Sequence, residues 1–411
     1  MRIAPPKVFE TWPINRSGTP PKLILSLSKD GALGETRTLD LWVRNPVFYP
    51  TELRAHDVKH ILLKNQTKFH LKGKYDIIAV MPRVISEKDI PDLLTSLKKT
   101  YTVFAPIAKN GELIYGEIAD PTKVVLTHGT TLLPPKIYFL PANEELFKVT
   151  GGKVQEEKSK KPFVVFGLNI KDLFAIVQLD QIMSKKPADT FYLKNRETST
   201  LVAIAENCVE NPPGGDLILE KVAGNEYQAT ILSEKGRKIA NLPVFKEKKV
   251  SLKKPSPETR TKLDQMLLDG ELLARAVEWS RENYPEIWER LGKTCLACGI
   301  CTYVCPLCYC TSTEDKISVD SSVCSRCRVW DACTLPGFAQ VASGHNFRPT
   351  QKDRYFNWFY HKFVRGYKET GQVLCVACHR CQKYCPAHID IEKVLDEVVE
   401  KFQKAHPERK F

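Results

Sequence analysis

The sequence predicts an α+β protein, with a mixed α/β N-terminal domain followed by an α-helical, cysteine-rich domain. Between residues 81 and 250, short apolar runs of strand composition alternate with patterns of helical periodicity. All of the 14 cysteines except Cys208 lie between Cys295 and Cys385. Behind the last cysteine, apolar side chains recur at the spacing of one helix face, at Ile391, Val394, Leu395, Val398, Val399 and Phe402.

The first 80 residues differ from the rest of the chain. Residues 1–57 are rich in Pro, Ser, Thr and Arg and keep no apolar period, and the run at 34–56 resembles translated non-coding sequence. We therefore predict a disordered or spurious extension at 1–57 and a lead-in without assigned structure at 58–80. Met81 is an alternative start of the protein, and a genuine disordered arm is the other interpretation.

We expect the α/β domain at 81–250 to begin with a helix that Ser86 and Asp89 are suited to cap. Its apolar residues have helical spacing. Strands are expected at 102–108, 112–118, 123–128, 162–168 and 199–207, a helix at 169–183, and two more short runs on either side of Gly224 and Asn225.

Lys171 and Asp172, at the start of the helix at 169–183, are interpreted as solvated or helix-start charges. Cys208 follows an apolar run and is interpreted as packed core. The domain contains no G-x-G-x-x-G or P-loop pattern, so we assign no nucleotide site to it.

Residues 251–293 are predicted to form a linker and helices. The stretch 246–260 is basic and contains proline, which is typical of a domain boundary. Ser256, Pro257 and Glu258 have the order of a helix cap, a first-turn proline and a first-turn acid. The helix behind them is expected to carry Leu263, Met266, Leu267, Leu273, Ala276 and Val277, with a second helix at 285–291.

One cysteine spacing occurs twice. Residues 295–306 (CLACGICTYVCP) and 375–386 (CVACHRCQKYCP) both read C-x2-C-x2-C-x3-C-P. This run binds 4Fe–4S clusters in bacterial ferredoxins, where the fourth Cys ligates the other of two clusters. We therefore predict a two-cluster ferredoxin domain at 294–400, with a tail at 401–411. Cluster 1 takes Cys295, Cys298, Cys301 and Cys385, and cluster 2 takes Cys375, Cys378, Cys381 and Cys305.

Zinc and disulfides explain these two runs less well. Structural zinc favours separated C-x2-C pairs or mixtures of Cys and His. Disulfides form in an oxidising compartment, whereas the start of the chain has no apolar signal region. We therefore expect a metal-binding protein of the reducing cytoplasm.

Five further cysteines lie in the insert between the runs: Cys308, Cys310, Cys324, Cys327 and Cys333. Three interpretations stay open, namely a third 4Fe–4S cluster, a zinc site using the pair Cys324-x2-Cys327, and inert thiols. The insert spans 69 residues (306–374), more than a compact ferredoxin needs, and we expect it to add helices. Its aromatic run at 356–367 is a helix candidate that covers the clusters or docks a partner.

The formal net charge of +13 does not indicate a nucleic-acid-binding protein. Residues 1–80 hold 13 Lys/Arg and 7 Asp/Glu, so they carry +6 of the +13. Two clusters with four thiolates each bring the remaining +7 to about +3. We find no nucleic-acid module, and no run of about 18 apolar residues that would span a membrane.

The chain resembles the iron–sulfur beta subunits of cytoplasmic sulfhydrogenases, which are NADP-linked nickel–iron hydrogenases, and the related A subunit of anaerobic sulfite reductase. The resemblance rests on CLACGICTYVCPLCYC, RVWDAC, ASGHNFRPT (342–350) with HKF (361–363), and CVACHRCQKYCPAHIDI. It implies a non-catalytic electron-transfer subunit between a flavin diaphorase subunit and a catalytic hydrogenase or sulfite reductase subunit. The alternatives are a heterodisulfide-reductase-like or glycolate-oxidase-like iron–sulfur subunit, and a metal-binding interaction module without redox function.

Two features depart from the family pattern. Family members often carry a Cys-Asp pair where this chain has Lys171-Asp172, and more cysteines after the position of Cys208, so the resemblance implies no metal site in the N-terminal domain. The second run has His379 where the first has Gly299.

Four residues are candidates for groups around the clusters. His379 tolerates positive φ less well than glycine. It either tunes cluster 2 by hydrogen bonding or protonation or is a solvated loop residue. His345, Asn346 and Arg348 are candidate donors to cluster sulfur or else loop-stabilising groups.

Overall fold

The computed structural model describes residues 82–126, 129–151, 153–156, 161–209, 211–222, 224–250, 260–320 and 322–407. All of these described residues belong to one compact unit. The predictions for residues 1–57, 58–80 and Met81, and for the cap at Ser256, Pro257 and Glu258, fall outside the described residues. The α+β class is confirmed.

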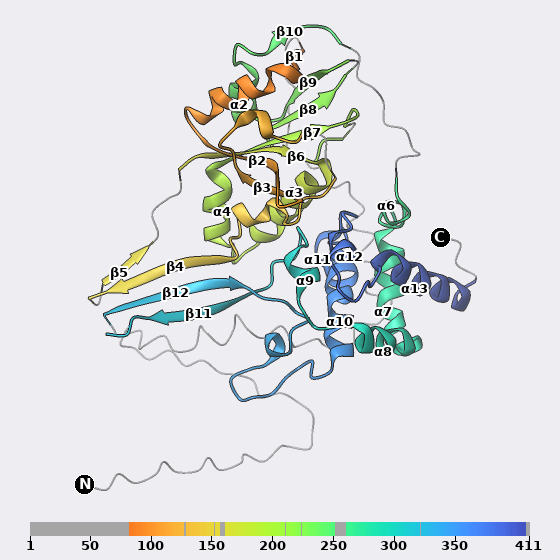
Figure 1. The fold of residues 1–411 in the computed structure, drawn as a ribbon. Helices are drawn as coiled ribbons and strands as arrows, with labels where there is room; N and C mark the ends of the chain where they lie inside the picture. Colours follow the sequence, from red (N-terminus) through yellow and green to blue (C-terminus); the bar gives the residue numbers. More distant parts are fainter. Residues whose placement is uncertain are drawn as a thin grey trace, which may run out of the picture. The chain divides into compact units, whose positions relative to one another are not determined.

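The N-terminal part is built on an eight-stranded sheet in the order β10-β1-β9-β8-β7-β6-β2-β3 (Figure 1). The four neighbouring strands β2, β6, β7 and β8 run parallel to one another, and all other neighbouring strands in this sheet are antiparallel. All residues of β6 and β7 are buried, as the unbroken apolar runs of central parallel strands require. The strands are β1 (Arg83–Ser86), β2 (Thr102–Lys109), β3 (Glu112–Glu117), β6 (Phe163–Leu168), β7 (Ser199–Ala205), β8 (Leu217–Lys221), β9 (Glu226–Ile231) and β10 (Lys246–Glu247).

The strand expected at 123–128 is wrong. Pro121–Lys123 is a single 3-10 turn, and Val124 makes only an isolated bridge to Ile107. The side chain of Asp120 accepts a hydrogen bond from the Thr122 N–H, which caps the turn and bends the chain before a strand forms. Residues 127 and 128 lie outside the described residues.

Helices cover both faces of this sheet. The buried residues of α2 (Ile90–Lys98) and α5 (Glu234–Ala240) share one apolar core with it, and those of α3 (Ile170–Met183) and α4 (Thr190–Glu197) share the other. Between β6 and α3, Gly167 has φ 72°, and a Cβ there would lie 2.9 Å from the ring of Pro106. Glycine thus permits the tight turn that places the start of α3 at the carboxyl end of β6.

A second sheet has four strands in the order β11-β12-β4-β5 and joins distant parts of the sequence. β4 (Asn143–Thr150) and β5 (Lys153–Glu156) belong to the N-terminal part, whereas β11 (Thr311–Ile317) and β12 (Val323–Trp330) belong to the insert. β12 lies antiparallel to β4 (Figure 1). The insert therefore adds a hairpin as well as helices, and the two predicted domains share a sheet.

The remaining helices pack around a third apolar core. The helix predicted through Leu263 and Val277 is two helices, because Asp269 caps a new helix by accepting from the Leu272 N–H. The first of them begins at Lys262, after a capping box of Thr261 and Asp264. The bounds are α6 (Lys262–Met266), α7 (Gly270–Asn283), α8 (Pro285–Thr294), α9 (Ile300–Tyr303), α10 (Gln351–Phe359), a π-helix (Tyr360–Arg365), α11 (Gly366–Thr370), α12 (Arg380–Lys383) and α13 (Ile391–Ala405).

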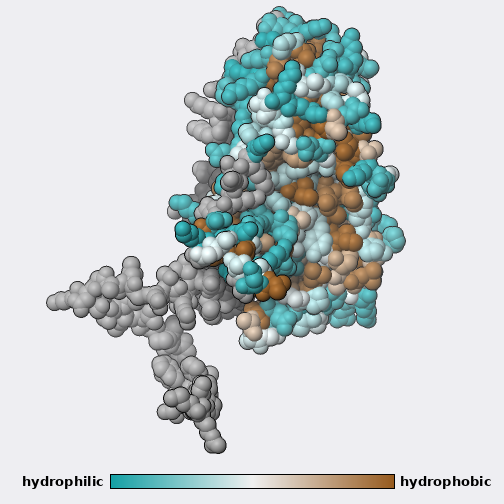
Figure 2. Space-filling view, turned by 60° about the vertical axis from the view of Figure 1, so that its left-hand side comes forward, coloured by the Kyte–Doolittle hydropathy of each residue, from teal (hydrophilic) through white to brown (hydrophobic). Residues whose placement is uncertain are grey.

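Two surface properties bear on partners. Among the described helices, none is both long and apolar enough to cross a membrane. Figure 2 shows hydrophobic residues gathered in a band on one face, with hydrophilic residues around it. The large apolar side chains with high exposure are Val154, Phe174, Leu268, Leu296, Ile317, Val319 and Phe347.

Candidate iron–sulfur centres

The two cysteine runs adopt the same backbone conformation. In the first run Ala297 and Gly299 have φ of 53° and 76°, and in the second Ala377 and His379 have φ of 49° and 57°. A short helix, α9 or α12, begins directly after the second of these residues and carries the third cysteine of its run. Left-handed residues between the cysteines turn successive N–H groups to one side, where they form a concavity for an anionic group.

The structure brings the predicted ligands together in two groups. One cavity is bordered by the cluster 1 set, together with Cys381. A second is bordered by the cluster 2 set. The four cysteines predicted for each cluster thus border one cavity, and Cys381 borders both. Tyr355 and Trp358 of α10 close the first cavity from one side.

Polar donors point at the sulfur atoms in both sites. The Leu307 N–H donates to Cys305 Sγ at 3.4 Å, and the Ile389 N–H to Cys385 Sγ at 3.5 Å. The side-chain amide of Gln351 donates to Cys295 Sγ at 3.2 Å. The ammonium group of Lys362 donates to Cys305 Sγ at 3.0 Å. Donors of this kind stabilise thiolates that carry metal, so the residues present fit 4Fe–4S clusters.

Burial holds most of the free thiols in their protonated form. Desolvation raises the pKa of Cys301 to about 12 and that of Cys375 to about 11, and it also raises the pKa of Cys295, Cys378 and Cys381. Cys305 is the exception, because a hydrogen bond from the Cys308 thiol and then the ammonium groups of Lys362 and Lys136 lower its pKa well below the usual value. Metal binding at these sites must therefore displace protons.

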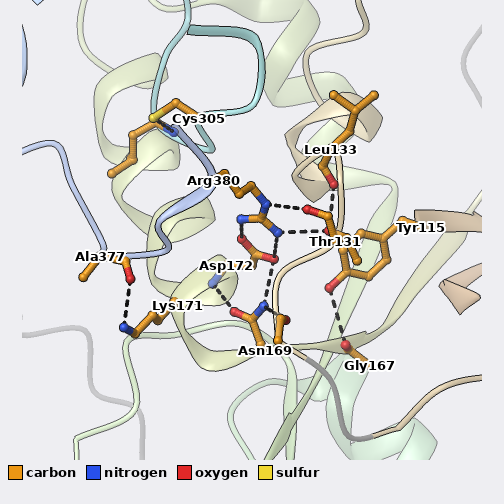
Figure 3. A network of polar contacts seen from close by, with 12 residues as sticks. Tyr115, Thr131, Leu133, Gly167, Asn169, Lys171, Asp172, Cys305, Ala377 and Arg380 are labelled. Atoms are coloured by element: carbon orange, nitrogen blue, oxygen red, sulfur yellow. Dashed lines mark hydrogen bonds and ion pairs between the residues drawn. The ribbon is translucent and has the colours of Figure 1, made fainter. Parts of the chain in front are cut away.

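The N-terminal part contacts the second run through a buried ion pair. Arg380 lies between Cys378 and Cys381, and its guanidinium donates to both carboxylate oxygens of Asp172, at 2.5 and 2.7 Å. Both side chains are fully buried. Arg380 also donates to the carbonyl and hydroxyl oxygens of Thr131 (Figure 3). The interpretation of Asp172 as a solvated charge is therefore wrong, although it does lie in the first turn of α3.

Lys171 adds a second contact between the same segments. Its ammonium donates to the Ala377 carbonyl at 2.9 Å (Figure 3). It also pairs with Asp264 of α6. Together the two contacts seat the loop of the second run on the carboxyl end of β6. In open α/β sheets, ligands bind at this edge, and here it receives a loop of the same chain.

The five insert cysteines do not form one group. Cys308 donates a hydrogen bond to Cys305, and Cys310 to Cys333. Cys324 and Cys327 lie on β12, where three residues span about 10 Å. The zinc site predicted for this pair stays a prediction. Among the described residues, no three Cys, His, Asp or Glu side chains surround a point that suits a single metal ion. A third 4Fe–4S cluster stays a prediction.

The other candidate residues make no hydrogen bond to ligand sulfur. Asn346 donates to the Pro336 carbonyl at 2.7 Å and accepts from the Arg348 N–H at 2.9 Å, which holds their loop. His345 is exposed and packs on Phe347. His379 lines the cluster 2 cavity, with Nδ1 3.1 Å from Gln382 Oε1 and Nε2 buried without a hydrogen-bond partner. Their roles toward the clusters stay predictions, as does the core role of Cys208.

Two further residues that donate to ligand sulfur, Gln351 and Lys362, are not indicated by the sequence. Lys362 lies in the HKF motif (361–363), but nothing in the spacing of that motif indicates contact with Cys305. Gln351 is the first residue of α10 and carries no motif at all.

Comparisons with known proteins agree with this geometry. Residues 294–389 match the family of 4Fe–4S dicluster domains. The beta subunit of sulfhydrogenase 2 from Pyrococcus furiosus is 30% identical over 325 residues, which cover 75% of this chain and 96% of that protein. No solved structure matches the chain.

Proposed function

The chain belongs to the family of sulfhydrogenase beta subunits, and we propose that it is a subunit that relays electrons through two 4Fe–4S clusters inside an oxidoreductase complex. One observation carries this proposal most directly. The four cysteines predicted for each cluster border one common cavity, and Cys381 borders both cavities.

In this proposal the protein holds each cluster with ligands from both runs. A bound cluster supplies the transfer of one electron at a time. The protein supplies the four thiolates of each site, N–H donors to sulfur, and apolar walls that keep water away.

The two sites differ in their access to partners. At cluster 1, Cys298 is exposed and the neighbouring Leu296 has 64% of its surface exposed. At cluster 2, Cys305 is buried, and Lys171 and Arg380 bind the second run to the N-terminal part. We therefore propose that electrons enter or leave the subunit at cluster 1. The hydrophobic band in Figure 2 supplies apolar surface of the kind that protein partners cover.

The proposed partners are a flavin diaphorase subunit and the catalytic subunit of a nickel–iron hydrogenase or sulfur reductase, in the cytoplasm. The name of the Pyrococcus relative supports the second of these. A sulfite reductase catalytic subunit is the alternative partner. To decide, the chain is tagged at its C-terminus in its native host, purified without oxygen, and its co-purifying subunits are identified by mass spectrometry. A nickel–iron subunit supports the first assignment and a sirohaem subunit the alternative, whereas absence of both contradicts the relay.

Metal analysis tests the number of clusters. We expect about eight irons per chain after anaerobic reconstitution and no stoichiometric zinc. About twelve irons would establish a third cluster among the insert cysteines. Clusters that give no electron paramagnetic resonance signal under any reducing condition would contradict electron transfer and favour a metal-binding interaction module.

A further inference from the structure

Lys362 is a buried cation beside the cluster 2 site. Only 4% of its surface is exposed, and its ammonium group donates to Cys305 Sγ at 3.0 Å and to the Leu374 carbonyl at 3.1 Å. The ring of Trp358 lies 5.1 Å away. Among the described residues, no carboxylate lies within ion-pair distance of this ammonium group.

The backbone also holds Lys362 in place. It lies in the π-helix (Tyr360–Arg365) between α10 and α11, and its carbonyl accepts from the Leu374 N–H at 2.8 Å. Leu374 directly precedes Cys375. Lys362 thus joins the two chain segments that supply cluster 2, through Cys305 on one side and the start of the second run on the other. Single π-turns inside helices occur frequently at functional sites.

At the cluster 1 site, the side chain that donates a hydrogen bond to ligand sulfur is neutral. The amide of Gln351 donates to Cys295 Sγ at 3.2 Å. The guanidinium of Arg354 lies behind it, donating to Gln351 Oε1 at 2.8 Å. Cluster 1 therefore receives a neutral hydrogen-bond donor on its ligand sulfur, although the charge of Lys362 also acts on Cys301, where it partly offsets the rise in pKa that burial causes.

The other buried cations near cluster 2 make no hydrogen bond to ligand sulfur, although the charge of Lys136 acts on Cys305 and that of Arg380 on Cys378. Arg380 is paired with Asp172. Lys136 donates to the carbonyls of Cys308 and Thr302, at 2.6 and 3.3 Å, and not to a ligand. Of the described cations, Lys362 is the one that a hydrogen bond connects to a cluster ligand.

From this asymmetry we infer that Lys362 is a positioning residue that sets the reduction potential of cluster 2 above that of cluster 1. This inference rests on the proposed electron-transfer function. Adding one electron makes a cluster one unit more negative, and an adjacent ammonium in a low-dielectric interior stabilises that extra charge. One electron moves from reduced cluster 1 to oxidised cluster 2, with no bond made and no proton transferred. Electrons that enter the subunit then collect at cluster 2.

The first test measures the order of the two potentials in the unaltered chain. The full-length, anaerobically reconstituted protein is titrated with electron paramagnetic resonance detection, and Cys378→Ser identifies which signal belongs to cluster 2. We expect the signal that Cys378→Ser perturbs to be the one with the higher potential. If it is the lower one, the inference is wrong, whether or not any Lys362 variant folds.

The second test removes the charge. At a fixed ambient potential, Lys362→Met and Lys362→Gln are expected to lower the ratio of reduced to oxidised cluster 2 at least tenfold. For one electron, this corresponds to lowering the reduction potential of cluster 2 by about 59 mV. Cluster 1 should change far less, and Lys362→Arg should restore most of the ratio. Gln351→Leu is the matched control and should affect cluster 1 alone. Neutral variants that keep eight irons and titrate like the parent overturn the inference, whereas a parent without reducible clusters contradicts the proposed function itself.

Discussion

Arg380 and Asp172 form a fully buried ion pair with two hydrogen bonds, which links the second cysteine run to the first turn of α3. The pair connects residues 208 positions apart in the chain. Two parallel hydrogen bonds between a carboxylate and a guanidinium restrict how the two groups can be oriented, so the pair fixes the orientation of the second run relative to α3. The loop that holds three ligands of cluster 2 is therefore oriented by the N-terminal part of the protein.

We expect Asp172→Asn to destabilise the protein by about 3–5 kcal/mol, because it leaves the charge of Arg380 buried without its partner. Denaturant unfolding of the reconstituted protein measures this loss, and iron analysis shows whether cluster 2 is retained. Asp315→Asn is the matched control, since Asp315 forms a two-point pair with Arg326 that is about half exposed. The control should change stability far less. Equal effects of the two substitutions would show that burial of the Arg380–Asp172 pair is unimportant.

Exchange of ligands between the two runs predicts which cysteine variants resemble each other. Cys385→Ala should abolish the same spectroscopic signal as Cys301→Ala, and Cys305→Ala the same signal as Cys375→Ala. Redox titration of each variant with paramagnetic detection measures this. Cys208→Ala, far from both cavities in sequence, is the control and should retain both signals. If Cys385→Ala instead abolished the signal that Cys375→Ala removes, each run would supply its own cluster.

His361 should make the protein less stable at acid pH. Burial, then the neighbouring charges of Arg365 and Lys362, lower the pKa of this imidazole to about 4, below the value of about 6.5 expected in the unfolded chain. Folding therefore favours neutral His361, and its contribution is retained above pH 6.5 and lost as the pH falls towards 4. Between pH 7 and 5 we expect a loss of about 1–2 kcal/mol that His361→Gln removes. Urea unfolding at both values measures it, and parallel losses in parent and variant would contradict the assignment.

His379→Gly tests whether the imidazole affects cluster 2. Its φ of 57° is costly for a residue with a side chain, so the substitution should raise stability by about 1 kcal/mol. We also expect the potential of cluster 2 to become less dependent on pH. Ala377→Gly is the matched control, because Ala377 has φ 49° in the same loop but no imidazole. It should raise stability without changing the pH dependence. The same pH dependence in His379→Gly and the parent would leave His379 with a loop role only.

The parts of the fold that follow from local pattern were predictable from the sequence. Unbroken apolar runs identified the central strands, and the repeated cysteine spacing identified two groups of four thiols. The β11–β12 hairpin was missed because its turn is made by Asp320, whose carboxylate accepts from the Ser318 and Ser322 hydroxyls, at 2.6 and 2.9 Å, without a glycine to mark it.

Contacts between distant segments had no signal in the sequence. Asp172 is a common first-turn acid, and only the folded chain shows that Arg380 is brought to it. Lys362 follows a run of aromatic residues. A lysine beside such a run commonly packs its methylene groups on the rings and keeps its ammonium group in water, so the sequence does not indicate burial of this charge. Its contact with Cys305 depends on how the π-helix and the first cysteine run meet.

The exchange of the fourth cysteines also has a consequence for biosynthesis. In the proposed assignment, the cluster 2 site lacks three of its four ligands until the second run is translated through Cys381, and the cluster 1 site lacks its fourth ligand until Cys385 is added. At about 5–20 residues per second, the 80 residues from Cys305 to Cys385 take about 4–16 s to translate. During that interval the first run presents thiols to the cell without a complete site. On this assignment, both clusters would be completed only after the second run has been translated, and a chain released before that run would carry neither.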